Sequence, residues 1–139
     1  MINSKNFDFS FSGLKTAVLY LDRDLKKKSG KNKLPKELIS RIAAEAQQAI
    51  VNVLVSKTIK AAQKFGAKSI MLSGGVSANK LLRSELQKNA EQREIRYFQP
   101  SPEYTTDNAA MIALASHFNH KPRHDNWKKV KADANWELS

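Results

Sequence analysis

The chain has 139 residues, 41% of them hydrophobic, and its 24 Lys and Arg against 13 Asp and Glu give a net charge of +11. This length and composition predict one compact domain with a packed core and argue against disorder. Because the sequence contains no cysteine, a disulfide framework, a thiolate zinc site and a cysteine nucleophile are excluded. The apolar runs are too short to span a bilayer and a signal-peptide core is missing, so we expect a soluble, cytoplasmic protein.

The positive charge is concentrated in the first half of the chain. Residues 1–70 carry 14 basic and 5 acidic side chains, and the segment 23–36 contains seven basic residues against Asp24. The seven are Arg23, Lys26, Lys27, Lys28, Lys31, Lys33 and Lys36. Two interpretations stay open: a surface for phosphate backbone, which releases counterions when neutralised, or a solvated helix end, where the helix dipole favours Lys.

The first half of the chain predicts an extended segment and two helices. Within 7–13 three Phe alternate with polar residues, which makes one face apolar. Ser12 is in position to cap a helix that ends at the Ser29–Gly30 breaker. Pro35 then opens a long helix of roughly 30 residues, and Gly66 stands where a C-terminal cap belongs.

The second half predicts an alternation of strands and helices. Residues 69–72 and 95–98 are short apolar runs, a helix is expected over 78–90, and another begins at Thr106 or Asp107. The fold class is therefore α/β, in the order helix, long helix, strand, helix, strand, helix, with the strands parallel. Since two strands form a marginal sheet, the apolar helix faces should pack on something outside these residues.

A glycine turn after the first predicted strand is a candidate anion site. Gly74 and Gly75 let the backbone approach a phosphate, and the helix that follows presents its N–H groups. The Asn79 amide can donate and accept, which suits a ribose or a carbonyl group. A simple tight turn explains the glycines equally well, because neither a dinucleotide fingerprint nor a Walker loop is present.

Asp107 is a candidate metal ligand at a predicted strand-to-helix loop. The alternative is an ordinary helix N-cap, which an Asp at such a position usually is. His117, His120 and His124 have a spacing that zinc could use, but the helix should fray there and no acid partner is near, so a metal role is not favoured. The order of residues does not favour a Ser/His/Asp triad.

Three blocks, in this order, resemble the C-terminal part of the universal tRNA threonylcarbamoyl transferase family (TsaD or Gcp type). The first is Phe-Ser-Phe-Ser-Gly-Leu-Lys-Thr-Ala at 9–17. The second is Gly-Gly-Val-Ser-Ala-Asn at 74–79, followed by Leu82 and Arg83. The third is Thr-Asp-Asn-Ala-Ala-Met-Ile-Ala at 106–113. The resemblance covers about residues 7–118.

The resemblance implies a partial actin-like ATPase fold. Residues 1–120 would be most of its second ribonuclease-H-like lobe, and 121–139 a polar tail. It also implies an acyltransferase that moves a threonylcarbamoyl group from threonylcarbamoyl-AMP to the adenosine beside the anticodon, in tRNAs that read codons starting with A. The implied partners are tRNA, accessory proteins of this pathway, and the N-terminal lobe or a companion chain that carries it.

The resemblance also assigns residues. Gly74 and Gly75 would lie against the nucleotide phosphate region, Asn79 would bind the adenylate, and Asp107 would hold the single metal ion, iron or zinc, which would polarise the carbonyl. No residue of this chain is implied to be catalytic. The family has a cysteine where Thr105 stands, with little expected effect. Its two metal-binding histidines lie in an upstream motif that this chain lacks, so the chain alone should bind metal weakly and be inactive.

Two other functions remain as alternatives. One is a basic tRNA-binding module without catalysis, which would use the segment 23–36. The other is a different actin-like nucleotide phosphotransferase, because a strand followed by Gly-Gly recurs across that fold. The blocks at 9–17 and 106–113 count against the second alternative.

Overall fold

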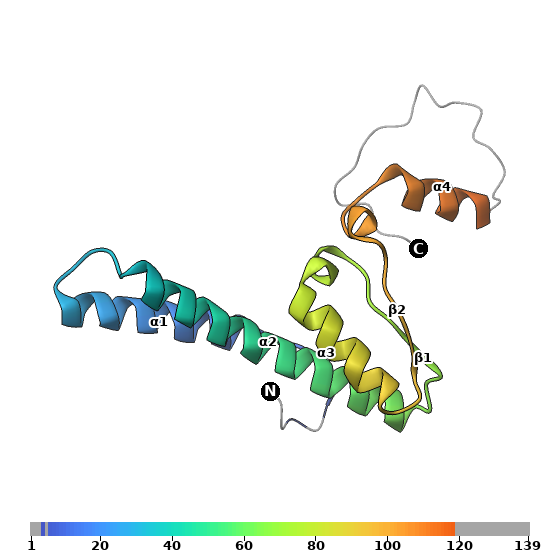
Figure 1. The fold of residues 1–139 in the computed structure, drawn as a ribbon, viewed down its shortest axis with the longest axis horizontal. Helices are drawn as coiled ribbons and strands as arrows, with labels where there is room; N and C mark the ends of the chain where they lie inside the picture. The colour runs from blue at the N-terminus through green and yellow to red at the C-terminus, as the bar shows by residue number, and fades with distance from the viewer. Residues whose placement is uncertain (1–3, 5, 119–139) are drawn as a thin grey trace. The chain divides into compact units, whose positions relative to one another are not determined.

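The computed structural model describes Ser4 and residues 6–118, and the chain divides into two compact units, Met1–Thr106 and Asp107–Ser139. The first unit carries most of the elements (Figure 1). They are α1 (Ser12–Ser29), α2 (Lys36–Lys64), β1 (Ser69–Met71), a 3₁₀ turn (Gly75–Ala78), α3 (Lys80–Glu91), β2 (Arg96–Phe98) and a second 3₁₀ turn (Pro102–Tyr104). In the second unit the described element is α4 (Ala109–Phe118). This order confirms the predicted alternation of helices and strands.

The start of α1 differs from the prediction. Ser12 is the first helical residue and Phe11 takes the N-cap position, where no side chain caps the helix. The Ser12 hydroxyl instead lies 3.1 Å from that of Ser10. The predicted end is confirmed, because Gly30 adopts the left-handed conformation with φ of 64° and its N–H donates to the Lys27 carbonyl.

The end of α2 is a Schellman motif. Gly66 has φ of 63° and its N–H donates to the Gln63 carbonyl at 3.3 Å, while the Ala67 N–H reaches the Ala62 carbonyl at 2.8 Å. A residue with a Cβ is strained at this φ, which is why a glycine follows the helix. The motif turns the chain back, so that β1 starts against the helix it has just left.

The two strands form the predicted parallel pair, with Ile70 opposite Tyr97 and Met71 opposite Phe98. Because side chains alternate along a strand, these pairs lie on opposite faces. Ile70 is buried and Tyr97 half-buried against the core. On the other face Met71 is 79% exposed and Phe98 50% exposed. The described part of the chain therefore covers one face of the sheet and leaves the other bare.

The core lies between α2, α3 and the covered face of the sheet. Its buried members are Val51, Val55, Ile59, Ala62, Ile70, Leu82, Leu86, Ala90 and Ile95. The α2 members recur at helical spacing and form one stripe, which packs on the stripe of α3. All the α2 members come from the second half of that 29-residue helix.

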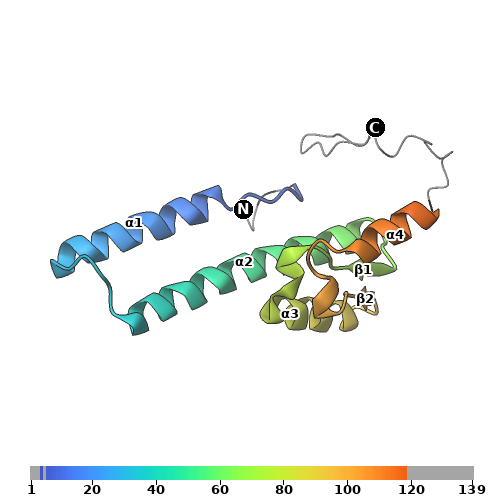
Figure 2. The same ribbon diagram turned by 90° about the horizontal axis from the view of Figure 1, so that it is seen from above.

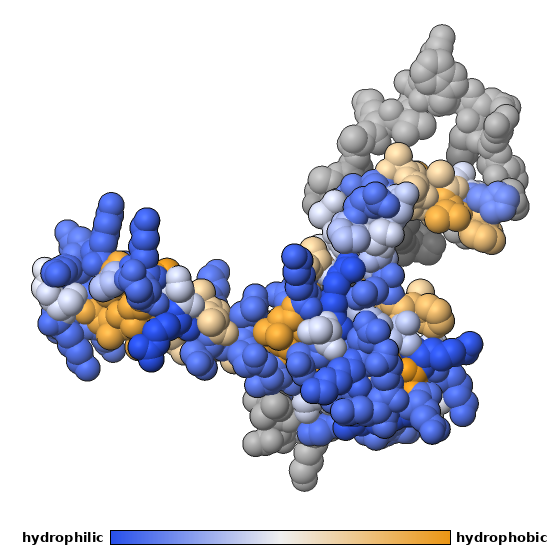
Figure 3. Space-filling model, viewed as in Figure 1, coloured by the Kyte–Doolittle hydropathy of each residue, from blue (hydrophilic) through white to orange (hydrophobic). Residues whose placement is uncertain are grey.

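The first half of α2 lies against α1, and its Gln47 also accepts a hydrogen bond from the Asn79 amide. The two helices run side by side as an antiparallel hairpin (Figures 1 and 2), and α1 has no buried residue. Apolar side chains reach the surface between polar ones along the hairpin (Figure 3). By length and composition alone α2 is apolar enough to cross a membrane, which the sequence interpretation did not anticipate. Its second half is already occupied by α3, so the apolar stripe there is a packing face.

The segment before α1 is fastened to α2 by a buried lysine. Lys57 is 2% exposed, and its ammonium donates to the Ser4 hydroxyl at 2.8 Å, the Asn6 side-chain oxygen at 3.4 Å and the Asp8 carbonyl at 2.6 Å. The Phe7 ring packs edge-on against Phe65. The Phe9 and Phe11 rings stack on each other, as the period of two predicts, but no strand pairs with this segment in the described part of the chain.

The start of α4 also differs from the prediction. The helix begins at Ala109, and the Asn108 side-chain oxygen accepts the Met111 N–H at 3.1 Å. Asn108 therefore caps α4, and the alternative in which Asp107 is the N-cap is wrong. The predicted polar tail at 121–139 lies outside the described residues.

We expect Lys57→Met to lower the free energy of unfolding by roughly 1–3 kcal/mol, because three hydrogen bonds to a buried charge are lost while the apolar stem is kept. Urea denaturation followed by circular dichroism measures this. Lys60→Met is the matched control, since Lys60 is exposed on the same helix and its change should stay within about 0.5 kcal/mol. Equal effects of the two substitutions would contradict the anchoring role of Lys57.

Candidate nucleotide-binding site

The predicted glycine turn is a hydrogen-bonded loop that follows the carboxyl end of β1. Gly74 has φ of 81° and ψ of 173°, a conformation that is essentially restricted to glycine. The Ser77 N–H donates to the Gly74 carbonyl at 2.9 Å, and the Asn79 N–H donates to the Val76 carbonyl at 3.0 Å. Gly74 and Gly75 are exposed, and a Cβ built on either meets no atom within 4 Å. Gly74 therefore shapes the backbone, and both glycines leave open space beside it.

Asn79 caps α3 and bridges to α2. Its side-chain oxygen accepts the Leu82 N–H at 3.0 Å, and its amide nitrogen donates to the Gln47 side chain at 3.2 Å. An amide has two donor hydrogens and two acceptor positions, so one of each remains for a ligand. The structure thus brings Gly74, Gly75 and Asn79 together in one loop, with the polar end of the Asn79 side chain fixed from two sides.

Two buried polar atoms beside this loop have no hydrogen-bond partner among the described residues. They are the hydroxyl of Ser77, a residue with no exposed surface, and one terminal nitrogen of Arg83. The Arg83 Nε–H donates to the Ser77 carbonyl. Burial raises the pKa of the Tyr97 hydroxyl, and the nearby charge of Arg83 opposes that rise in part. Neutral Tyr97 donates to Gln99 at 3.0 Å.

The predicted metal ligand Asp107 is exposed and belongs to the second unit. Among the described residues no group of three His, Cys, Asp or Glu side chains could hold a metal ion. The described residues therefore do not form a metal site by themselves, and Asp107 as a ligand to a metal shared with residues outside them stays a prediction. His117 lies in α4 with its ring edge-on to Phe118, whereas His120 and His124 lie outside the described residues.

Thr105, which stands where the resemblance expects a cysteine, is buried. Its hydroxyl donates to the Pro102 carbonyl at 2.8 Å and closes the second 3₁₀ turn. The side chain therefore has a local structural partner in the loop before α4.

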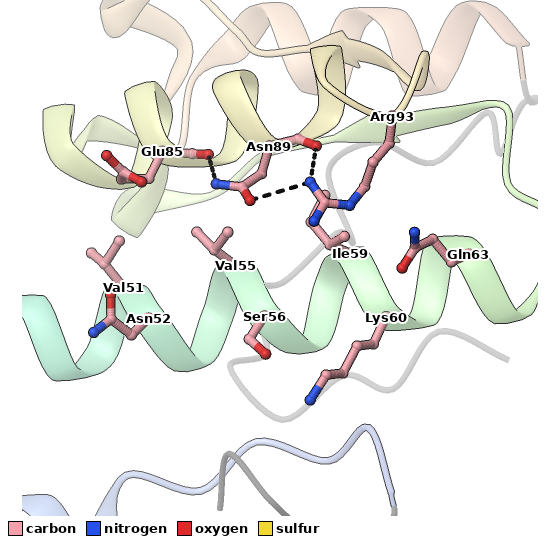
Figure 4. A pocket seen from close by; sticks show the side chains of 10 residues that line it. All are labelled: Val51, Asn52, Val55, Ser56, Ile59, Lys60, Gln63, Glu85, Asn89 and Arg93. Carbon is pink, nitrogen blue, oxygen red and sulfur yellow. Dashed lines mark hydrogen bonds between the residues drawn. The ribbon is translucent and has the colours of Figure 1, made fainter.

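A separate groove lies between α2 and α3 (Figure 4) and has a volume of about 450 Å³. Its floor is apolar, and its rim includes Glu85, Asn89 and Arg93. The Arg93 guanidinium donates to the Asn89 carbonyl at 2.9 Å, and the Asn89 amide donates to the Glu85 carbonyl at 2.9 Å. None of the predicted site residues lines this groove.

The basic segment 23–36 forms the tip of the α1–α2 hairpin. Lys26, Lys27 and Lys28 occupy the last turn of α1, where the helix dipole favours cations. Lys26 pairs with Asp22 at 2.7 Å, and the other basic side chains of the tip are exposed. This geometry agrees with the solvated helix end, and a phosphate-binding role for the tip stays a prediction.

These features define an α/β protein with a glycine turn at the carboxyl end of a two-stranded parallel sheet. Open α/β sheets in general bind ligands at this edge. A family model described as tRNA N6-adenosine threonylcarbamoyltransferase matches residues 1–114. The chain belongs to this family, which confirms the resemblance and its class of enzyme, a transferase.

Curated relatives carry the same description. The protein of Thermosipho africanus is 47% identical over 121 residues, which are 87% of this chain and 34% of the relative. That of Francisella tularensis subsp. holarctica is 48% identical over 86% of this chain and 34% of its own length. That of Chlorobium phaeobacteroides is 51% identical over 78% and 29%, respectively. The chain therefore spans about a third of the length of the relatives it matches.

The sequence interpretation missed three residues, two that contact the loop and one that holds the N-terminal segment. The Gln47 side chain accepts a hydrogen bond from the Asn79 amide, 32 positions away in the sequence. Lys57 donates to the Asp8 carbonyl of the N-terminal segment, and Arg83 donates to the Ser77 carbonyl. Arg83 stood inside a recognised block but was given no role. Lys57 lies on a different face of α2 from the buried stripe, and nothing local in the sequence points to its contacts or to that of Gln47.

We expect Gly74→Ala to lower the free energy of unfolding by about 1–3 kcal/mol, because alanine is strained at this φ and ψ. Gly75→Ala is the control: Gly75 lacks a positive φ and has equally open space, so alanine should be neutral or stabilising by up to about 1 kcal/mol. Thermal unfolding of both variants tests the pair. A Gly75→Ala variant that is the less stable of the two would refute the assigned turn geometry.

Proposed function

We propose that this chain forms the nucleotide-facing part of a tRNA N6-adenosine threonylcarbamoyltransferase with an actin-like ATPase fold. In this proposal it takes part in moving the threonylcarbamoyl group from threonylcarbamoyl-AMP to the adenosine beside the anticodon. The observation that carries the proposal is the loop of Gly74, Gly75 and Asn79 at the end of β1, in a chain that belongs to this family.

The chemistry of the loop suits an adenylate. The open space beside Gly74 and Gly75 admits a phosphate close to the backbone, and the dipole of α3 favours negative charge at its N-terminus. The remaining donor and acceptor of Asn79 suit a ribose hydroxyl or a carbonyl group. These residues bind and orient the substrate, and none of them activates a nucleophile or transfers a proton.

The reaction itself requires more than this chain. Met71 and Phe98 leave one face of the sheet bare, and two apolar grooves of about 540 and 450 Å³ flank the α1–α2 hairpin. A parallel sheet is normally covered on both faces. We therefore assign these surfaces to the N-terminal lobe, or to a companion chain that carries it. That partner would also supply the remaining metal ligands beside Asp107, and this chain alone would lack transferase activity.

The nucleotide role is tested by titrating the chain with AMP and with threonylcarbamoyl-AMP, using calorimetry. We expect both to bind, and Asn79→Ala to weaken them at least about tenfold, because the ligand loses its hydrogen-bonding amide. Asn89→Ala is the matched control, an asparagine at the other end of α3 that lies on the separate groove. Circular dichroism confirms that each variant keeps its helices. Equal binding by wild type and Asn79→Ala would disprove the assignment.

The basic hairpin tip supports tRNA as a partner, and a binding module without catalysis remains the second candidate on that observation. If the tip contacts phosphates, reversing Lys27, Lys28 and Lys31 to Glu should reduce the slope of log affinity against log salt by about two. Lys26 is kept because it pairs with Asp22. Reversal of Lys60, Lys68 and Lys88, which are exposed elsewhere, is the control. An unchanged slope in the tip variant, measured by filter binding, would remove the tip from the tRNA surface.

A further inference from the structure

Arg83 contacts the loop that precedes its own helix. It lies in the first turns of α3, where the helix dipole opposes positive charge. Its backbone N–H donates to the Asn79 carbonyl at 3.1 Å, and helical side chains lean toward the N-terminus of their helix. The guanidinium therefore reaches back past Asn79, and its Nε–H donates to the carbonyl of Ser77.

Arg83 forms no ion pair with a described acidic residue. Among the described residues the one ion pair joins Lys26 to Asp22. The contacts of Arg83 are instead with the loop, and one of its terminal nitrogens is buried without a partner. Ser77, whose carbonyl it holds, is fully buried and lies two residues before Asn79. Arg83 is therefore connected by a hydrogen bond to the segment that carries Asn79.

We propose that Arg83 is a positioning residue for Asn79, an inference that rests on the proposed adenylate-binding role of that side chain. By fixing the Ser77 carbonyl, Arg83 fixes the 3₁₀ turn in which the Ser77 and Asn79 N–H groups bond to the Gly74 and Val76 carbonyls. This 3₁₀ turn sets the position of Asn79 at the start of α3. It thereby also sets the direction of the remaining donor hydrogen and acceptor position of the Asn79 side chain. Arg83 acts through the loop and does not need to touch the ligand.

A first experiment needs no ligand. Hydrogen exchange is measured by NMR on the full chain for the amides of Ser77, Asn79 and Leu82. We expect Arg83→Met to accelerate exchange at these amides about tenfold or more, since the turn loses its anchor. Arg93→Met is the matched control, because Arg93 also donates to a backbone carbonyl from the same helix, at its other end. Exchange at the three amides that is unchanged in Arg83→Met would overturn the proposal.

A second experiment separates positioning from general destabilisation. AMP affinity is measured for Asn79→Ala, Arg83→Met and the double variant. If Arg83 acts through Asn79, each single change weakens AMP binding, and the double variant binds no more weakly than Asn79→Ala alone. Effects that multiply in the double variant would show that Arg83 acts independently and would overturn the proposal. If the wild-type chain does not bind AMP, the proposed nucleotide role fails, and the exchange experiment still decides whether Arg83 anchors the turn.

Discussion

The second half of α2 is the element on which the rest of the first unit depends. Val51, Val55, Ile59 and Ala62 form one buried stripe that contacts α3 and the sheet. The same stretch contains Lys57, which donates a hydrogen bond to the N-terminal segment. Just before it lies Gln47, whose side chain accepts a hydrogen bond from the Asn79 amide. A polar face and an apolar face of one helix thus organise both the core and the loop. A change that rotated this helix would displace the candidate site and the core together.

The sequence predicted the features that local physics controls. Gly30 ends α1 and Gly66 ends α2 because only a residue without a Cβ is relaxed at their φ of 64° and 63°. The predictions failed where two neighbouring polar residues competed. Ser12 pairs with the Ser10 hydroxyl instead of capping α1, and Asn108 caps α4 where Asp107 was the expected alternative. Such choices depend on fractions of a kcal/mol, which spacing alone does not resolve.

The candidate site was predictable only as far as it lies in one loop. Gly74, Gly75 and Asn79 are within six positions, and their grouping follows from strand, turn and helix. The hydrogen bonds of Gln47 and Lys57 join residues 32 to 53 positions apart in the sequence. They form only because the loop and the N-terminal segment both lie against α2 in the folded chain. A metal site needs still more, since its ligands must converge from several elements. Residues 4 and 6–118 do not supply such a set.

The distribution of buried and exposed surface separates what this chain, about a third of its relatives' length, stabilises by itself from what it leaves uncovered. The loop is stabilised from within the unit, by backbone bonds of the turn, by the Asn79 cap and by the stripe of α2. None of these contacts uses the bare face of the sheet, where Met71 and Phe98 are exposed. In the proposed function, adenylate binding is therefore local to this chain, whereas the transfer step also uses groups of the N-terminal lobe. On that proposal, binding by this chain and transfer by the assembled lobes are separate properties, and each can be measured without the other.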